Sequence, residues 1–196
     1  MQIVNCWVCE LPNSIELIGG ENIVVKNCQL GAQPTGITCK VQEVNKLSFI
    51  NNQVYPDGRE NLVLDACNNC VIEGNNFKSY YNGILVLNGN DNTVNKNIFW
   101  LTGAVQNQLL DHGDDFGIIN VKGNNNMVAS NSLSCEWAYA GAVTVNAVQG
   151  TGNVFKNCFV DNLESYRVFL VNAQTEVSNC VSVSYTHLRA HETSQD

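Results

Sequence analysis

The chain has 196 residues, of which 44% are hydrophobic and 14% are charged, and its formal net charge is −8 at pH 7. This length suits a single domain with a substantial core. No apolar run reaches the ~20 residues of a membrane-spanning helix, and the first ten residues lack the basic start and apolar stretch of a signal peptide. The acidic balance, without any cluster of Lys and Arg, argues against nucleic acid and against a membrane surface as partners.

An asparagine recurs along the chain at a regular interval. Neighbouring members are 22 to 26 residues apart, except for one interval of 34. The recurring residues are Asn5, Asn27, Asn51, Asn75, Asn97, Asn131, Asn157 and Asn179. A period of this length is the signature of a solenoid.

Short β-branched runs lie between the recurring asparagines, for example residues 83–87, 117–121 and 141–145, and they alternate with turns rich in Asn and Gly. No helical period interrupts them. Successive coils stacked about 4.8 Å apart would form parallel sheets around one core. The sequence therefore predicts an all-β fold, a single-stranded right-handed parallel β-helix of about eight coils over residues 1–182. Stacked amides hydrogen-bond from coil to coil, so we expect the recurring asparagines to form a buried Asn ladder.

Nine cysteines include two Cys-x-x-Cys pairs, Cys6/Cys9 and Cys67/Cys70. Such pairs can bind zinc together. Cys9 and Cys67 are 58 positions apart, which is almost three coils, so the four thiols are not expected to converge. We predict reduced thiols packed in the core of a cytoplasmic protein, with a redox or metal role as the alternative.

The 34-residue interval between Asn97 and Asn131 contains about ten extra residues, and insertions in solenoids form loops that often lie on the binding face. Trp100 opens this segment and is the strongest candidate for stacking on a sugar ring. Trp7 is expected in the core or in a subunit contact. The other candidate substrate-binding residues are Asp111, His112, Asp114 and Asp115. A solvated acidic loop and calcium ligation are the alternative interpretations of this segment.

The end of the chain does not resemble a natural fold. Residues 183–193, Val-Ser-Tyr-Thr-His-Leu-Arg-Ala-His-Glu-Thr, resemble the in-frame translation of a transposon-based sequencing adapter, a scar of genes assembled from metagenomic reads. We therefore treat residues 183–196 as a non-native tail. His187 and His191, although spaced i and i+4, are for that reason not taken as a metal pair.

Four segments resemble the inulin fructotransferases and their difructose-anhydride hydrolase relatives. They are Asn-Ser-Ile-Glu-Leu at 13–17, Asn-Asn-Gln-Val at 51–54, Tyr-Asn-Gly-Ile-Leu at 81–85, and residues 114–126. The resemblance implies a homotrimeric β-helix enzyme without a cofactor or metal, which forms or hydrolyses difructose anhydride by intramolecular fructosyl transfer on fructan. It also implies that further N-terminal coils precede this chain in the family.

The resemblance places the family's catalytic Glu at Glu16, which would protonate the glycosidic oxygen. The family's catalytic Asp falls on Asn5, or on Val4 if the gap lies differently, and neither is a carboxylate. Glu10, six residues before Glu16, is the candidate to take its place. Two other functions stay open, namely a calcium-dependent polysaccharide lyase or epimerase, and a catalytically inactive carbohydrate-binding β-helix.

Overall fold

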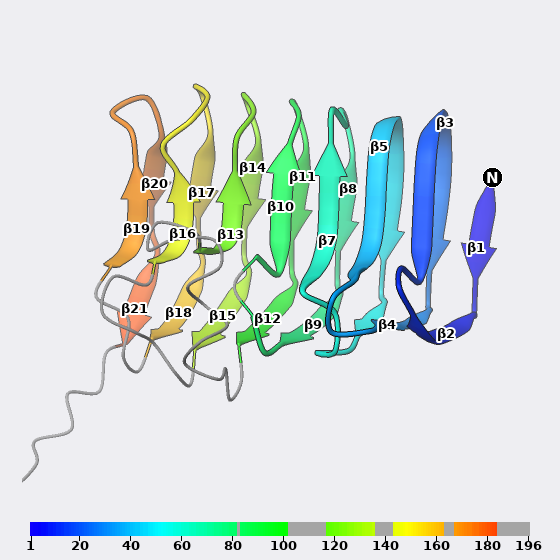
Figure 1. Ribbon diagram of the computed structural model, residues 1–196. Coiled ribbons are helices and arrows are strands. Elements are labelled where there is room, and N and C mark those ends of the chain that lie inside the picture. The colour runs from blue at the N-terminus through cyan, green and yellow to red at the C-terminus, as the bar shows by residue number, and fades with distance from the viewer. Residues whose placement is uncertain (82, 102–116, 136–142, 163–166, 184–196) are drawn as a thin grey trace, which may run out of the picture.

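The computed structural model describes residues 1–81, 83–101, 117–135, 143–162 and 167–183. These residues form parallel strands that stack into a solenoid of about seven coils (Figure 1). The predicted all-β parallel β-helix is confirmed, and the number of coils is close to the expected eight. The described ranges contain no helix, and thus none long and apolar enough to span a membrane. Of the proposed tail, residues 183–196, only Val183 is described, and the rest lies outside these ranges.

Each coil passes through three strand faces, named here by their places in Figure 1. The front face consists of the first halves of β3 (Ile15–Lys26) and β5 (Ile37–Ile50), then β7 (Glu60–Asp65), β10 (Leu85–Asn88), β13 (Gly117–Val121), β16 (Val143–Ala147) and β19 (Arg167–Val171). The back face consists of β1 (Gln2–Val4), the second halves of β3 and β5, β8 (Val71–Glu73), β11 (Thr93–Asn95), β14 (Met127–Ala129), β17 (Val154–Lys156) and β20 (Glu176–Ser178). The lower sheet consists of β2 (Trp7–Leu11), β4 (Gln29–Ala32), β6 (Gln53–Val54), β9 (Asn76–Ser79), β12 (Ile98–Leu101), β15 (Ser132–Cys135), β18 (Phe159–Asn162) and β21 (Val181–Val183).

The core runs through the solenoid as columns of like side chains. In the lower sheet the strand register aligns Leu30, Val54, Phe77 and Phe99, all fully or almost fully buried. The rings of Phe77 and Phe99 are nearly parallel, with centroids 5.0 Å apart. Alternation along each strand sends every second side chain into this core and the others to the outer surface. The outer positions of the lower sheet are therefore the ones that can form a site.

An asparagine ladder occupies the corner between the back face and the lower sheet. Its members are Asn52, Asn75, Asn97 and Asn131, each at most 2% exposed. The Oδ1 atom of Asn97 accepts hydrogen bonds from the backbone N–H and the Nδ2 of Asn75, both at 2.9 Å. The Nδ2 of Asn97 in turn donates to Oδ1 of Asn131 and to the Ile72 carbonyl. The amides thus satisfy one another inside the fold, as predicted.

The membership of the ladder differs from the predicted one. Asn5, Asn27, Asn51, Asn157 and Asn179 do not belong to the buried column; they have φ values of 52° to 57° and precede it by one residue. At these places the column is continued by Cys6, Cys28, Asn52, Cys158 and Cys180. The recurring asparagines therefore combine two neighbouring columns: a left-handed turn position, which Asn tolerates, and a buried position that needs hydrogen-bonding groups.

Cysteine replaces asparagine at both ends of the ladder. The Sγ of Cys28 lies 3.6 Å from the Ile3 carbonyl and that of Cys158 lies 3.7 Å from the Val128 carbonyl. These carbonyls correspond to those that accept from the ladder amides one coil away. The predicted core packing is confirmed for Cys28, Cys39, Cys67, Cys70 and Cys158, which are buried, and the described cysteines are free thiols. A second buried ladder, not predicted, links Asn92, Asn126 and Asn153 at the corner between the front and back faces.

Candidate functional site

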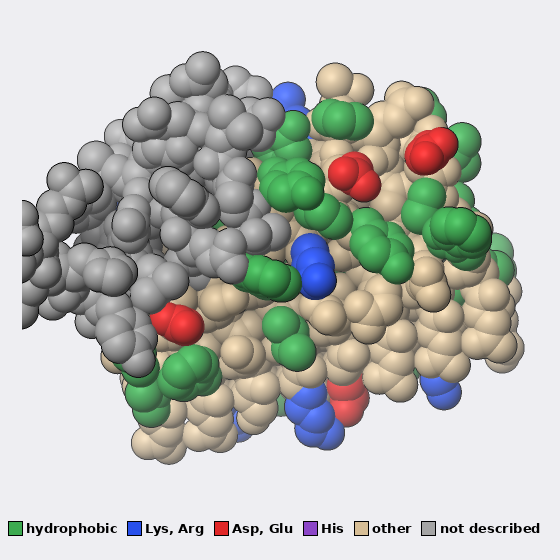
Figure 2. Space-filling model, turned by 90° about the horizontal axis from the view of Figure 1, so that it is seen from below, with side chains coloured by type: hydrophobic (Ala, Val, Ile, Leu, Met, Phe, Trp, Pro, Cys, Tyr) green, Lys and Arg blue, Asp and Glu red, His purple; other side chains and the backbone are tan. Residues whose placement is uncertain are grey.

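A groove opens beside the lower sheet at its first three coils. Its volume is about 620 Å³. Its lining is formed by Trp7, Cys9, Glu10, Ala32, Gln33, Pro34, Tyr55 and Asp57. Figure 2 shows the lower sheet from outside, where hydrophobic and acidic side chains gather on the N-terminal part of this face. The groove therefore combines apolar surface with carboxylates.

A β-bulge places Glu10 at this groove. The register between β2 and β4 shifts between Val8 and Leu11, so that β2 carries one extra residue. Glu10 takes a φ of 65°, a conformation that costs a non-glycine residue about 1–2 kcal/mol. The side chain of Gln33 donates from Nε2 to the Glu10 carbonyl over 3.1 Å and holds the bulge. Bulges of this kind re-aim a side chain, and here the re-aimed residue is a carboxylate in the groove.

Two aromatic rings border the groove. Trp7 is 78% exposed, and its Nε1 donates to the Cys9 Sγ over 3.0 Å. Of the two expectations for Trp7, the core position is wrong, because residue 7 occupies an outward position of β2, and the subunit contact stays a prediction. The hydroxyl of Tyr55 donates to Oε1 of Gln29 over 3.0 Å. Gly31 lies between Cys9 and Tyr55 and leaves the space there without a side chain.

The structure separates the two predicted catalytic glutamates. Glu16 lies on the front face in β3, where its Oε1 is 3.2 Å from the Nζ of Lys40. It borders a different hollow, next to Gly19 and Gly20. Glu10 shares its groove instead with Asp57, which the sequence analysis missed. Asp57 lies in the tight turn that follows β6. Comparing the position of this turn within its coil with that of Glu10 would have indicated from the sequence that the two residues lie near each other.

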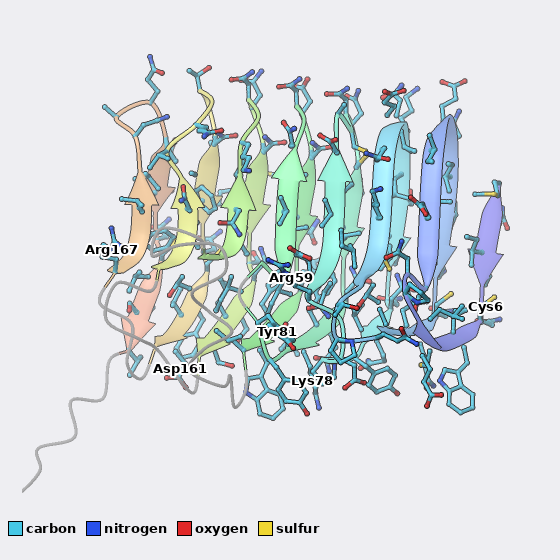
Figure 3. The ribbon with its side chains drawn as sticks, in the orientation of Figure 1. Cys6, Arg59, Lys78, Tyr81, Asp161 and Arg167 are labelled. Carbon is cyan, nitrogen blue, oxygen red and sulfur yellow. The ribbon has the colours of Figure 1, made fainter. Side chains whose placement is uncertain are left out.

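Trp100 lies on the same outer face, farther along the solenoid. The register puts Trp100 next to Lys78, whose Nζ lies 4.8 Å from the centroid of the indole ring. The same column continues through Ser134 to Asp161, whose Oδ1 is buried with no hydrogen-bond partner among the described residues. Figure 3 shows Lys78 and Asp161 along the lower sheet. The remaining predicted substrate-binding residues, Asp111, His112, Asp114 and Asp115, lie outside the described residues.

These features define the class of the protein, a parallel β-helix with an open groove on one sheet. Residues 2–179 match the family described as "Periplasmic copper-binding protein (NosD)", and the chain belongs to that family. None of the curated proteins matches the chain in sequence.

The fold is shared with solved structures of DFA-IIIase from Arthrobacter chlorophenolicus A6. The structure without its lid has a TM-score of 0.79 at 20% identity, covering 94% of this chain and 52% of that one. The complex with DFA-III gives 0.76 at 19% identity, covering 91% and 50%, and the complex with GF2 gives 0.71 at 22%, covering 89% and 46%. The resemblance found in the sequence is thus confirmed at the level of the fold. This chain spans about half the length of those structures.

The family description raises the question of a copper site. Copper in proteins is bound by cysteine, histidine and methionine ligands. The described part of the chain holds no group of three His, Cys, Asp or Glu side chains that fits a metal ion. Burial raises the pKa of the Cys39 thiol, and the hydrogen bond to Cys67 together with burial raises that of Cys70. The Cys39 and Cys70 thiols stay protonated at neutral pH, whereas the hydrogen bond with Cys70 lowers the pKa of Cys67 to about 7. One such thiol without a group of three ligands around it does not form a metal site, so the described residues do not fit copper.

Proposed function

We propose that the protein acts on fructan or difructose anhydride in the groove beside the lower sheet, by intramolecular fructosyl transfer and without a cofactor. The observation that carries this proposal is the meeting of an exposed indole, a phenol and two carboxylates, Glu10 and Asp57, in one groove. Aromatic rings and carboxylates are the groups that bind and cleave sugars. The shared fold with DFA-IIIase supports the choice of substrate class.

The chemistry needs one protonated and one ionised carboxyl group. We propose Glu10 as the general acid that gives its proton to the glycosidic oxygen while the bond to the anomeric carbon breaks. A hydroxyl of the neighbouring fructosyl unit attacks that carbon, and Asp57 takes the hydroxyl proton. Water in place of the hydroxyl gives hydrolysis of the anhydride. Glu16 is the competing candidate for the acid, because the sequence resemblance points to it.

Carbohydrate binding without turnover is the second candidate function. The family resemblance places the catalytic Asp at Asn5 or at Val4, and in the structure Asn5 fills a left-handed turn position with a φ of 57°. This is a position that Asn itself favours, so a structural role accounts for it. The aromatic side chains of the groove would bind sugar in either case.

The experiment incubates the full chain with inulin and, separately, with difructose anhydride, and chromatographs the products. Glu10→Gln is expected to lower the rate at least a hundredfold, in line with the loss of a general acid. Glu73→Gln is the matched control, since Glu73 is a back-face glutamate paired with Lys96. If Glu16→Gln abolishes the reaction while Glu10→Gln does not, the acid is Glu16. If the folded chain binds inulin without product, the protein is a binding module.

We further propose a homotrimer working in a reducing cytoplasm. Eight described cysteines are free thiols, which suits such a compartment. Light scattering behind a gel-filtration column measures the oligomeric state, and a monomer there would contradict the trimer.

A further inference from the structure

The outer face of the lower sheet carries a line of aromatic and hydrogen-bonding side chains that extends beyond the groove. The hydrogen bond from the Tyr55 N–H to the Leu30 carbonyl continues the register of β6, and it places Tyr55 in the column of Lys78 and Trp100. Trp7 lies four coils before Trp100, at the start of the neighbouring outward column, which passes through Gln29, Gln53 and Asn76 to Ile98. The line therefore consists of these two adjacent columns. Four steps of about 4.8 Å make the line about 19 Å long. A disaccharide is far shorter than this.

The outward column that begins at Trp7 continues through amide side chains to the half-exposed Ile98, and Lys78 lies between Tyr55 and Trp100 in the other column. Gln29, Gln53 and Asn76 occupy the outward positions that follow Trp7 coil by coil. Such a surface alternates apolar rings with hydrogen-bonding groups. A protein partner generally needs a larger contiguous apolar patch with few polar groups at its centre. A sugar chain, which presents a ring face and hydroxyls at each unit, fits the observed alternation.

The charged side chains on the outer face of the lower sheet favour an uncharged ligand over an anionic one. Glu10, Asp57 and Asp161 are acidic, and the ammonium group of Lys78 is engaged by the ring of Trp100. A polysaccharide of uronic acids would meet like charges along the line, which disfavours it. A fructan carries no charge and meets no such repulsion.

We propose that the lower sheet binds a linear neutral oligosaccharide along the solenoid axis, with Trp100 and Lys78 forming a distal subsite separate from the groove. This inference rests on the proposed function and deepens it by naming a long chain as the ligand. The distal subsite holds the remote part of the chain while its end lies in the groove. Affinity should therefore rise with chain length up to the span of the line.

The test measures binding of the full chain to a fructo-trisaccharide and to long-chain inulin by titration calorimetry. Trp100→Ala is expected to weaken inulin binding about tenfold, equivalent to the loss of one stacked ring, and to leave trisaccharide binding unchanged. Trp100→Phe keeps a ring and is expected to restore most of the affinity. Met127→Ala is the control, because Met127 is a half-buried side chain on the back face. Circular dichroism verifies that each variant is folded.

Each outcome decides the inference. Equal loss of affinity for both ligands in Trp100→Ala, or no loss for inulin, would overturn the distal subsite. Failure of the wild-type chain to bind inulin more tightly than the trisaccharide would overturn it as well. If inulin binds in the expected way but no product forms, the subsite stands and the proposed enzymatic function fails.

Discussion

Replacement of Asn97 by alanine is expected to destabilise the protein strongly, because Asn97 is the centre of the buried ladder. Its side chain is 1% exposed and takes part in four hydrogen bonds. Alanine would leave the Asn75 N–H and the Ile72 carbonyl without these partners. A buried backbone group that loses its partner costs about 1–3 kcal/mol, so the free energy of unfolding should fall by about 2–6 kcal/mol.

Asn97→Cys is a sharper comparison. Cys158 occupies the same column, accepts hydrogen bonds from Asn131, and points its thiol at the Val128 carbonyl over 3.7 Å. A cysteine at position 97 can therefore accept from the Asn75 N–H and donate to the Ile72 carbonyl. We expect it to lower the free energy of unfolding by less than half as much as alanine does. Asn95→Ala, in the same coil, removes an amide whose Oδ1 has no hydrogen-bond partner, and should be nearly neutral.

The assay is urea unfolding followed by far-ultraviolet circular dichroism, with the slope of the transition checked for each variant, because repeat proteins can lose two-state behaviour. The reasoning is refuted if Asn97→Ala and Asn95→Ala unfold at the same midpoint. It is also refuted if the cysteine variant is as unstable as the alanine variant.

The remaining predictions concern the stacking of the coils, the ionisation of Cys39 and the accessibility of the thiols. Gly123→Ala should prevent folding to soluble β-rich protein, because its Cβ would collide with the Gly89 carbonyl oxygen. Gly19→Ala meets no atom within 4 Å and bears only the strain of a φ of 69°, about 1–2 kcal/mol, so it should still fold by circular dichroism. Burial and the neighbouring Cys28 raise the pKa of Cys39 in the folded protein. At any pH below the unfolded pKa of about 8.5, this thiol is protonated in both states and its contribution to the free energy of unfolding is complete. Above it, stability should fall by about 1.4 kcal/mol per pH unit, and urea unfolding of Cys39→Ala should show a slope shallower by that amount. A thiol reagent should label Cys9 in the folded protein and Cys39 only after unfolding, as mass spectrometry of the labelled peptides would show.

Sequence periodicity was sufficient to predict the fold. The 22-to-26-residue repeat and the short β-branched runs can be satisfied only by stacked coils, since no single strand buries its own apolar side. The identity of the ladder residues could not be predicted in the same way. Asn51 and Asn52 are adjacent and of the same type, and a repeat count does not distinguish a left-handed turn from the buried position beside it. The φ of Asn51 and the burial of Asn52 separate them.

The site was predicted in part. Glu10 was selected for its distance from Glu16 along the chain, but the structure places these two residues beside different hollows. Neither the bulge that re-aims Glu10 nor the turn that brings Asp57 to it follows from hydrophobic patterning, because both depend on local register. The core position expected for Trp7 was wrong for a related reason: whether a side chain points inward or outward depends on the phase of its strand, and the bulge in β2 makes that phase hard to count from the sequence.

The central claim is that the groove bordered by Trp7, Tyr55 and Glu10 is where sugar binds. A crystal structure of the full chain with a bound fructo-oligosaccharide tests it most directly. We predict sugar rings against the indole of Trp7 and the phenol of Tyr55, with a glycosidic oxygen within hydrogen-bonding distance of Glu10. Sugar bound instead beside Glu16 and Lys40, with the groove empty, would contradict the account.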